Sequence, residues 1–190
     1  MLALAVACSD AAAQLHASPI TGPAVYELEG YSVAAPQGKN WFEMRRDKQQ
    51  ALFGKRIESP THSFAAAATS GVIAEKFERP EQFQEYVDKM RGGSAALGYK
   101  VIDYNSELET SFPAWCVRYR LRSEDRDAPH AKGRVLLKED YGVTCLHPAL
   151  PGLIVDVGYS ERGRPAEISA ELQAEGEAFL RSLKFTPRRP

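Results

Sequence analysis

The fold is decided by the stretch from Phe112 to Gly163, which contains FPAWCVRYRLR (112–122), GRVLLKEDYGVTCLHP (133–148) and GLIVDVGYSERG (152–163). Aromatic and β-branched residues are frequent in all three segments, and turn-forming or charged residues separate them, which is typical of β-strands. In the first segment apolar residues alternate with arginines, so we expect one apolar and one cationic face. The three segments together predict an antiparallel meander.

The composition is that of a globular protein. The chain has 190 residues, of which 44% are hydrophobic and 26% charged, and this length suits a single domain with a sizeable core. The net charge of -1 provides no field that would attract nucleic acid, so we expect no nucleic-acid partner. No apolar run approaches the ~20 residues that a helix needs to span a bilayer.

The N-terminal segment MLALAVAC (1–8) resembles the end of a bacterial lipoprotein signal, a short Leu/Ala run followed by a cysteine. The resemblance implies that Cys8 is lipidated and becomes the first residue of the mature chain. Cleavage after Ala13, where an A-x-A pattern occurs, and a disordered Ala-rich tail are the alternatives. The first two interpretations both predict export to the periplasm or envelope, and the first also predicts that the protein touches a membrane only through an anchor at Cys8. We expect 1–13 to be a signal or anchor remnant and 14–24 a linker.

Two helices are expected, each starting at a proline. The first spans 80–91, because acidic residues occupy its first turn and glycines follow its last, and an extension through Ala96 is left open. The second starts at Pro165, and Gly176 on its apolar stripe would allow a close approach to a sheet. The apolar stripes consist of Phe83, Val87 and Met90 in the first helix and of Ile168, Leu172, Phe179 and Leu183 in the second.

Strands are expected at 26–35 with a bulge or bend at Gly30, from Trp41, and at 51–57, 63–75 and 99–108. The alanines of 63–75 indicate a strand that lies beneath a closely packed helix. The order β-rich, helix, β-rich, helix predicts an α+β fold with two helices on a mainly antiparallel sheet. We expect one domain over 25–186 and a tail over 187–190.

Cys116 and Cys145 lie in segments that we expect to be neighbouring strands. In an exported protein, a pair that remains after Cys8 is lipidated or removed favours a disulfide, and two buried free thiols are the alternative. The spacing of Cys145 and His147 also permits a nucleophile and its base, or half of a metal site. A bonded Cys145 would exclude that chemistry. His147 is more typical of a residue that flanks the turn at Pro148.

The arginine row, which consists of Arg118, Arg120 and Arg122, is the main candidate for binding an anionic ligand or a carboxylate-bearing partner. The acidic residues at 124, 125 and 127 are expected to neutralise it. Tyr159 and Arg162 end the last strand, where they either line a small cleft or pin the turn. The sequence has no serine-hydrolase elbow, phosphate loop or metal motif, so we predict no catalytic residue, metal or cofactor.

Several short phrases resemble the Mog1/PsbP-like α/β sandwich. They are Y-x-V-x-x-P (31–36) followed by Trp41, the helix at Pro80 and the closing FLRSLKF (179–185), and the resemblance covers about Val25 to Phe185. This family includes a photosystem II extrinsic subunit, a regulator of a nuclear transport GTPase and many bacterial envelope lipoproteins. The resemblance implies a non-catalytic accessory protein that binds another envelope protein. A small anionic-ligand binding module is the alternative.

Overall fold

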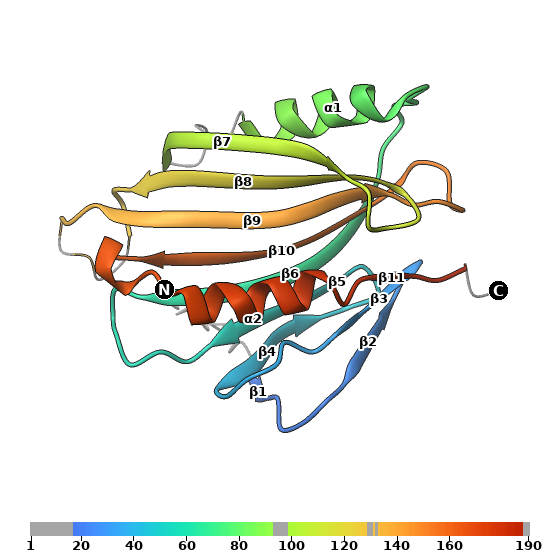
Figure 1. Ribbon diagram of the computed structural model, residues 1–190. Helices are drawn as coiled ribbons and strands as arrows, with labels where there is room; N and C mark the ends of the chain where they lie inside the picture. The colour runs from blue at the N-terminus through green and yellow to red at the C-terminus, as the bar shows by residue number, and fades with distance from the viewer. Residues whose placement is uncertain (1–16, 93–98, 129–130, 132, 188–190) are drawn as a thin grey trace, which may run out of the picture.

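The computed structural model describes residues 17–92, 99–128, 131 and 133–187. Within them it confirms the α+β fold, with a large antiparallel sheet, a small sheet and two helices packed on the large sheet (Figure 1). The large sheet has the spatial order β1 (Ser18–Pro19), β4 (Trp41–Arg46), β5 (Gln50–Lys55), β6 (Ser63–Val72), β10 (Leu153–Gly163), β9 (Leu136–Leu146), β8 (Trp115–Asp125), β7 (Tyr99–Glu109). The small sheet has the order β11 (Lys184–Phe185), β3 (Tyr31–Ala34), β2 (Val25–Leu28).

The chain builds the large sheet in two meanders that meet at its centre. Strands β4, β5 and β6 follow one another, and helix α1 (Pro80–Gly92) then leads to the far edge at β7. Strands β7, β8, β9 and β10 return from that edge, and β10 pairs with β6. The predicted antiparallel meander is therefore confirmed, and β7 extends it by one strand at the edge.

The two faces of the large sheet are covered differently. Helix α2 (Ala170–Leu180) and the small sheet lie on one face, which we call the α2 face (Figure 1). Helix α1 lies on the opposite α1 face against β7 and β8, where Phe83 and Val87 pack on Val117. The main core lies on the α2 face and includes Tyr31, Val33, Trp41, Phe53, Phe64, Cys116, Cys145, Val157, Phe179 and Leu180.

The close approach predicted for Gly176 is confirmed. Gly176 is buried in α2, and a Cβ atom at this position would lie 2.4 Å from Cγ of Tyr159. Glycine therefore lets α2 lie directly on the tyrosine ring of β10. The preceding residue ties the same helix to the other meander, because Glu175 Oε2 accepts hydrogen bonds from Trp41 Nε1 at 2.8 Å and Lys55 Nζ at 2.6 Å.

Cys116 of β8 and Cys145 of β9 form a disulfide, as predicted. The two residues lie directly opposite each other in the strand register. Both are buried in the main core. The bond therefore joins adjacent strands from within the hydrophobic interior.

Two predicted elements differ from the structure. Segment 26–35 is not one bent strand, because β2 and β3 pair as a hairpin around Gly30, whose φ of 83° is a conformation that glycine adopts readily. The second helix starts at Ala170, with Ser169 as its N-cap. The residues from Pro165 to Glu167 form a separate 3-10 turn, η2.

Three further residues depart from the predicted helical stripes. Met90 is 41% exposed, because Phe77 and Tyr86 complete the contact with Phe83 in its place. Ile168 precedes the start of α2, and Leu183 is buried although it follows the end of that helix.

The structure describes only part of the terminal segments that the sequence analysis predicted. Part of the segment expected to be a linker belongs to the sheet, since Ser18 and Pro19 pair with β4. Cys8 with the rest of 1–16, the optional extension of α1 through Ala96, and 188–190 of the tail lie outside the described residues.

Candidate functional site

The arginine row lies on the α2 face, where β7, β9 and α2 supply its counter-charges. Arg118 Nε lies 2.9 Å from Glu109 Oε2, and its Nη1 lies 3.0 Å from Glu177 Oε2. Arg120 and Arg122 both approach Glu139 Oε1, at 3.3 Å and 2.8 Å. Each arginine of the row is therefore already matched by a glutamate.

The acidic residues expected to neutralise the row have other partners. Glu124 pairs with Arg126 and Lys100, and Asp125 pairs with Arg162. Asp127 instead has its backbone N–H bonded to Asp125 Oδ1.

The pairing at Glu109 has an electrostatic signature. Partial burial alone would raise the pKa of this carboxyl group, but the backbone N–H of Ser111 and the guanidinium of Arg118 lower it below its usual value. The pKa of Arg118 is correspondingly raised by Glu109 and Glu177, which outweigh the effect of burial. Both groups are thus held in their charged forms.

A hollow lies beside the row, between α2 and the strands β7 and β8. It has a volume of about 500 Å³ and is lined by Asn105, Glu107, Arg118, Arg120, Tyr141 and Glu177, among others. The Arg120 side chain is 41% exposed, and its guanidinium carbon lies 5.4 Å from the centre of the Tyr141 ring. We call this feature the arginine hollow.

The other predicted binding residues are not brought to this hollow. Tyr159 lies beneath α2, stacked on Tyr141 at 5.0 Å, and its hydroxyl donates to Glu177 Oε1. Burial raises the pKa of Tyr159, and Glu177 raises it further. Arg162 pairs with Asp125, which lies on β8.

His147 has a structural environment at the end of β9. Its Nδ1 accepts hydrogen bonds from the backbone N–H groups of Ala149 and Leu150, at 3.0 Å and 2.9 Å. Its Nε2 donates to the carbonyl oxygen of Gly30 at 2.7 Å. This matches a histidine that flanks a turn. Since Cys145 is bonded to Cys116, it has no thiolate to act with His147.

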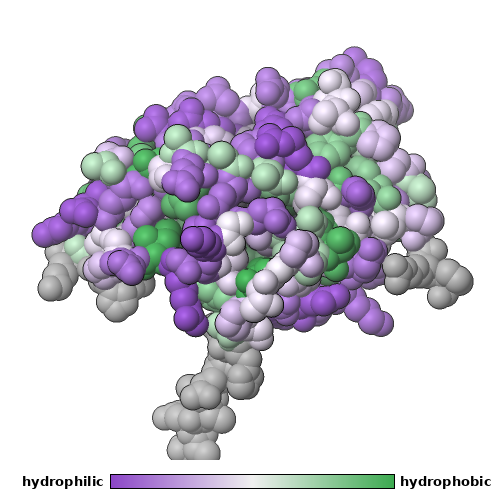
Figure 2. Space-filling view, turned by 60° about the horizontal axis from the view of Figure 1, so that its bottom comes forward, coloured by the Kyte–Doolittle hydropathy of each residue, from purple (hydrophilic) through white to green (hydrophobic). Residues whose placement is uncertain are grey.

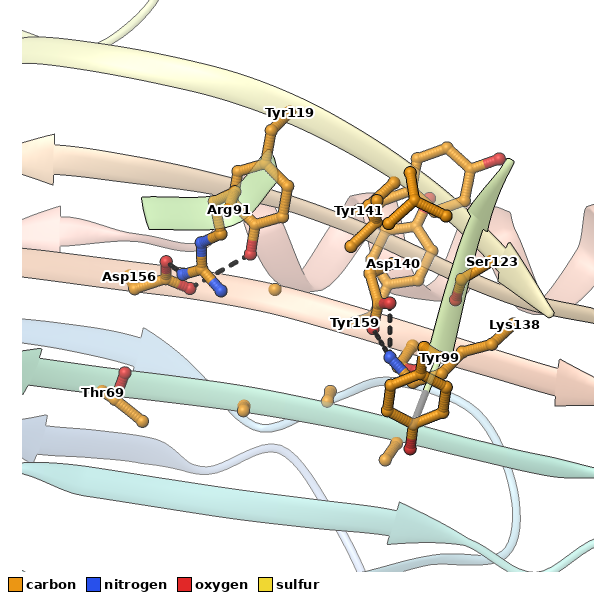
Figure 3. Close-up of a pocket in the computed structure, with 17 residues that line it drawn as sticks. Thr69, Arg91, Tyr99, Tyr119, Ser123, Lys138, Asp140, Tyr141, Asp156 and Tyr159 are labelled. Carbon is orange, nitrogen blue, oxygen red and sulfur yellow. Dashed lines mark hydrogen bonds and ion pairs between the residues drawn. The ribbon is translucent and has the colours of Figure 1, made fainter. Parts of the chain in front are cut away.

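A second cavity lies on the α1 face and was not predicted (Figure 3). It has a volume of about 380 Å³ and spans β6, β10, β9, β8 and β7, with Arg91 of α1 at one end. Ala67, Gly158 and Gly142 lie side by side on β6, β10 and β9, and Tyr119 follows Gly142 on β8. Because these residues have small side chains or none, they form the floor of the cavity, and larger side chains around them form its walls.

Each end of this α1-face cavity carries a cation, a carboxylate and a tyrosine (Figure 3). At one end Arg91 pairs with Asp156, and its guanidinium carbon lies 4.5 Å from the centre of the Tyr119 ring. At the other end Lys138 pairs with Asp140, and Nζ lies 5.1 Å from the centre of the Tyr99 ring. Burial raises the pKa of both tyrosines, so their hydroxyls stay protonated.

The sequence did contain a signal for this cavity. Gly142 and Gly158 each interrupt a run of strand-forming residues, and glycine inside a strand often marks a close approach by another group. Here Tyr119 approaches, because a Cβ atom at Gly142 would lie 2.3 Å from its Oη. The alanines of β6 divide between both faces, with Ala66 and Ala68 in the main core and Ala65 and Ala67 lining the cavity.

A buried acidic pair lies where β10 meets η2 and α2. Glu161 and Glu139 lie directly opposite each other on β10 and β9, and both are buried. Glu161 Oε1 lies 2.9 Å from His62 Nε2 and accepts a hydrogen bond of 2.9 Å from the backbone N–H of Ser169. Its Oε2 has no partner among the described residues.

The described residues contain no group of three His, Cys, Asp or Glu side chains that could hold a metal ion. In the same part of the chain, no helix has the length and apolar character to cross a membrane. The face seen in Figure 2 is mostly hydrophilic, and its hydrophobic side chains form small separate groups. Comparisons with protein-family models and with curated proteins give no match to this chain.

Proposed function

We propose that this protein is an exported, non-catalytic accessory protein of the bacterial envelope, which a lipid on Cys8 attaches to a membrane. The buried disulfide between Cys116 and Cys145 supports an oxidising compartment, because cytosolic thiols are kept reduced. Such an environment is expected for a periplasmic domain that carries an N-terminal lipid. The likeness to Mog1/PsbP-like envelope lipoproteins is part of this proposal.

The partner is another envelope protein that docks a carboxylate-bearing segment at the arginine hollow. The observation that carries this assignment is the hollow itself, with the 41% exposed Arg120 side chain on its wall. Arginine and tyrosine are enriched among the residues that dominate binding energies at protein interfaces, and Arg120 and Tyr141 stand together here. A partner carboxylate would share Arg120 with Glu139. Glu139 Oε1 lies 3.3 Å from Nη2 of Arg120, so other nitrogens of the guanidinium can bind the partner.

The test is a crosslinking pull-down from a bacterial host, comparing Arg120→Gln with the unaltered protein. Removing a central arginine is expected to lower recovery of the specific partner at least about tenfold. Arg181→Gln is the matched control, because Arg181 is 65% exposed on the same face but does not line the hollow. Equal recovery of the partner by both variants, or no specific partner with the unaltered protein, contradicts the proposal.

A small anionic ligand is the second candidate, because the volume of the arginine hollow also falls in the range of small-molecule sites. Calorimetric titration with citrate distinguishes the two. Citrate binding that Arg120→Gln abolishes, without any recovered protein partner, would favour the ligand over the protein.

The anchor is tested separately by cell fractionation. Cys8→Ser is expected to move the protein from the membrane fraction to the soluble periplasmic fraction, because it removes the thiol that carries the lipid. An unaltered distribution contradicts lipidation at Cys8.

A further inference from the structure

The α1-face cavity exists because glycine occupies positions 142 and 158 on the sheet surface. A Cβ atom at Gly158 would lie 3.0 Å from the carbonyl oxygen of Tyr141 and 3.2 Å from Tyr119 Oη. A larger residue at Gly158 or Gly142 would therefore displace Tyr119 or occupy the floor. The floor is apolar and shallow along Ala65, Ala67 and Gly158, and Val101 and Leu121 add apolar wall.

The charges around the cavity cancel. Arg91 is paired with Asp156 and Lys138 with Asp140, one pair at each end (Figure 3). An anionic or cationic ligand would have to separate one of these pairs, which is unfavourable in a partly desolvated site. The walls therefore favour a ligand without net charge.

Several hydroxyl groups line the cavity, and that of Tyr119 donates to Asp156 Oδ1. Ser123 is only 1% exposed and lines the cavity. Tyr99 and Thr69 also bring hydroxyl groups to the lining (Figure 3). A hydroxyl in a cavity wall can both donate a hydrogen bond to a ligand and accept one from it.

We propose that the α1-face cavity binds a neutral saccharide of one or two rings. Sugar hydroxyls both donate and accept hydrogen bonds, which matches Ser123, Tyr99 and Thr69. The C–H faces of a sugar ring pack against the Ala/Gly floor and the tyrosine rings. The volume of about 380 Å³ lies at the small end of ligand sites, where one or two rings are the size expected. This site is separate from the arginine hollow and does not rest on the proposed protein partner.

The experiment is a nuclear magnetic resonance titration of the full chain with a defined sugar panel. The uncharged members are glucose, galactose, N-acetylglucosamine, maltose, cellobiose and trehalose, and the charged comparators are glucuronate and glucosamine. At least one uncharged sugar is expected to shift the amide signals of Gly158 and Ser160 in a saturable way. Failure of every uncharged member to do so, or tighter binding of a charged comparator, overturns the proposal.

Two variants test the location. Ala67→Phe fills the floor and is expected to weaken binding at least about tenfold, whereas Val72→Phe, at the 79% exposed end of the same strand, leaves it unchanged. Ser123→Ala is expected to weaken binding about two- to tenfold, the value of one neutral hydrogen bond. Should Ala67→Phe fail to fold, Ala65→Leu fills the same floor. Binding that survives the filled floor overturns the site.

Discussion

At the residue scale, the buried carboxyl group of Glu161 has unusual surroundings. It is 0% exposed and faces Glu139, and among the described residues it receives hydrogen bonds from His62 and the backbone of Ser169. Arg120 and Arg122, which lie two strands away on β8, are paired with Glu139. Burial consequently raises the pKa of Glu161, Glu139 raises it further, and His62 and Ser169 lower it only in part.

This raised pKa predicts a pH-dependent stability. The folded state binds the Glu161 proton more tightly than the unfolded chain, so the free energy of unfolding falls as pH rises from about 4.5 through the raised pKa. One group contributes a slope of at most about 1.4 kcal/mol per pH unit. Glu161→Gln, measured by urea unfolding between pH 4 and 7, is expected to lose this decrease.

Glu171→Gln is the control, because Glu171 is exposed in α2. The prediction fails if the Glu161→Gln and Glu171→Gln profiles have the same slope. Glu167 acts in a different range: hydrogen bonds from Arg164 lower its pKa to about 2, so its contribution is lost only as pH falls below about 4.5.

Individual side chains were predictable only as far as strand alternation reaches. The pattern in 115–122 placed the three arginines on one face, as observed. Their counter-ions were sought among neighbours in sequence, whereas the actual ones, Glu109, Glu139 and Glu177, come from β7, β9 and α2. Cross-strand neighbours lie closer than residues two apart on one strand, and register is not visible in a single sequence.

At the element scale, the packing of α2 depends on an absent side chain. Glycine normally weakens a helix interior by about 1 kcal/mol relative to alanine. At Gly176 the ring of Tyr159 occupies the space that a methyl group would need. The contact between α2 and β10 therefore outweighs the helix propensity.

Gly176→Ala is expected to lower the free energy of unfolding by about 1–3 kcal/mol, the usual cost of overpacking, despite the gain in propensity. Ala178→Gly at an exposed position of the same helix should cost about 1 kcal/mol and serves as the control. Urea unfolding of both variants provides the measurement. A more stable Gly176→Ala protein would show that α2 does not lie on Tyr159.

The long strands were predictable because their alternation runs over many residues, as in Leu153–Gly163. The short elements were not predictable, because single residues within them are compatible with more than one local structure. Gly30 sits inside an alternating run and therefore indicates a bulge as readily as the hairpin that forms. Pro165 has the features of a helix start, but only a 3-10 turn follows before Ser169 caps α2.

At the scale of the whole molecule, the disulfide and the main core act on the same unit. Cys116 and Cys145 are buried with Trp41 of β4 and Phe179 of α2, which are far apart along the chain. Loss of the disulfide should therefore lower the stability of the entire domain. It should not merely release one hairpin.

Reduction of the disulfide is expected to cost about 3.5 kcal/mol, from the loop entropy of its 29-residue separation. Urea unfolding with and without a reductant measures this cost, and Trp fluorescence and circular dichroism should report one midpoint in each condition. Cys116→Ala with Cys145→Ala should reproduce the reduced value. Two alkylatable thiols in the unreduced mature protein, apart from Cys8, contradict the prediction.

The overall strand order was beyond sequence patterns, since it depends on which strands meet across the centre. The pairs Val72–Leu153 and Ser63–Arg162 join β6 to β10 across α1 and the whole second meander. No pattern in the sequence of either strand indicates that the other is its partner. Hydrophobic alternation establishes that each has a buried face but leaves its neighbour open.

The junction of β6 with β10 also sets the order in which a nascent chain can mature. When β4, β5 and β6 have been synthesised, β6 still lacks its second neighbour in the sheet. That neighbour is β10, which is synthesised only near the C-terminus. Contacts so distant along the chain slow folding and leave intermediates prone to aggregation. A protein of this topology is therefore expected to stay unfolded for most of its synthesis, a state that is compatible with the export we propose.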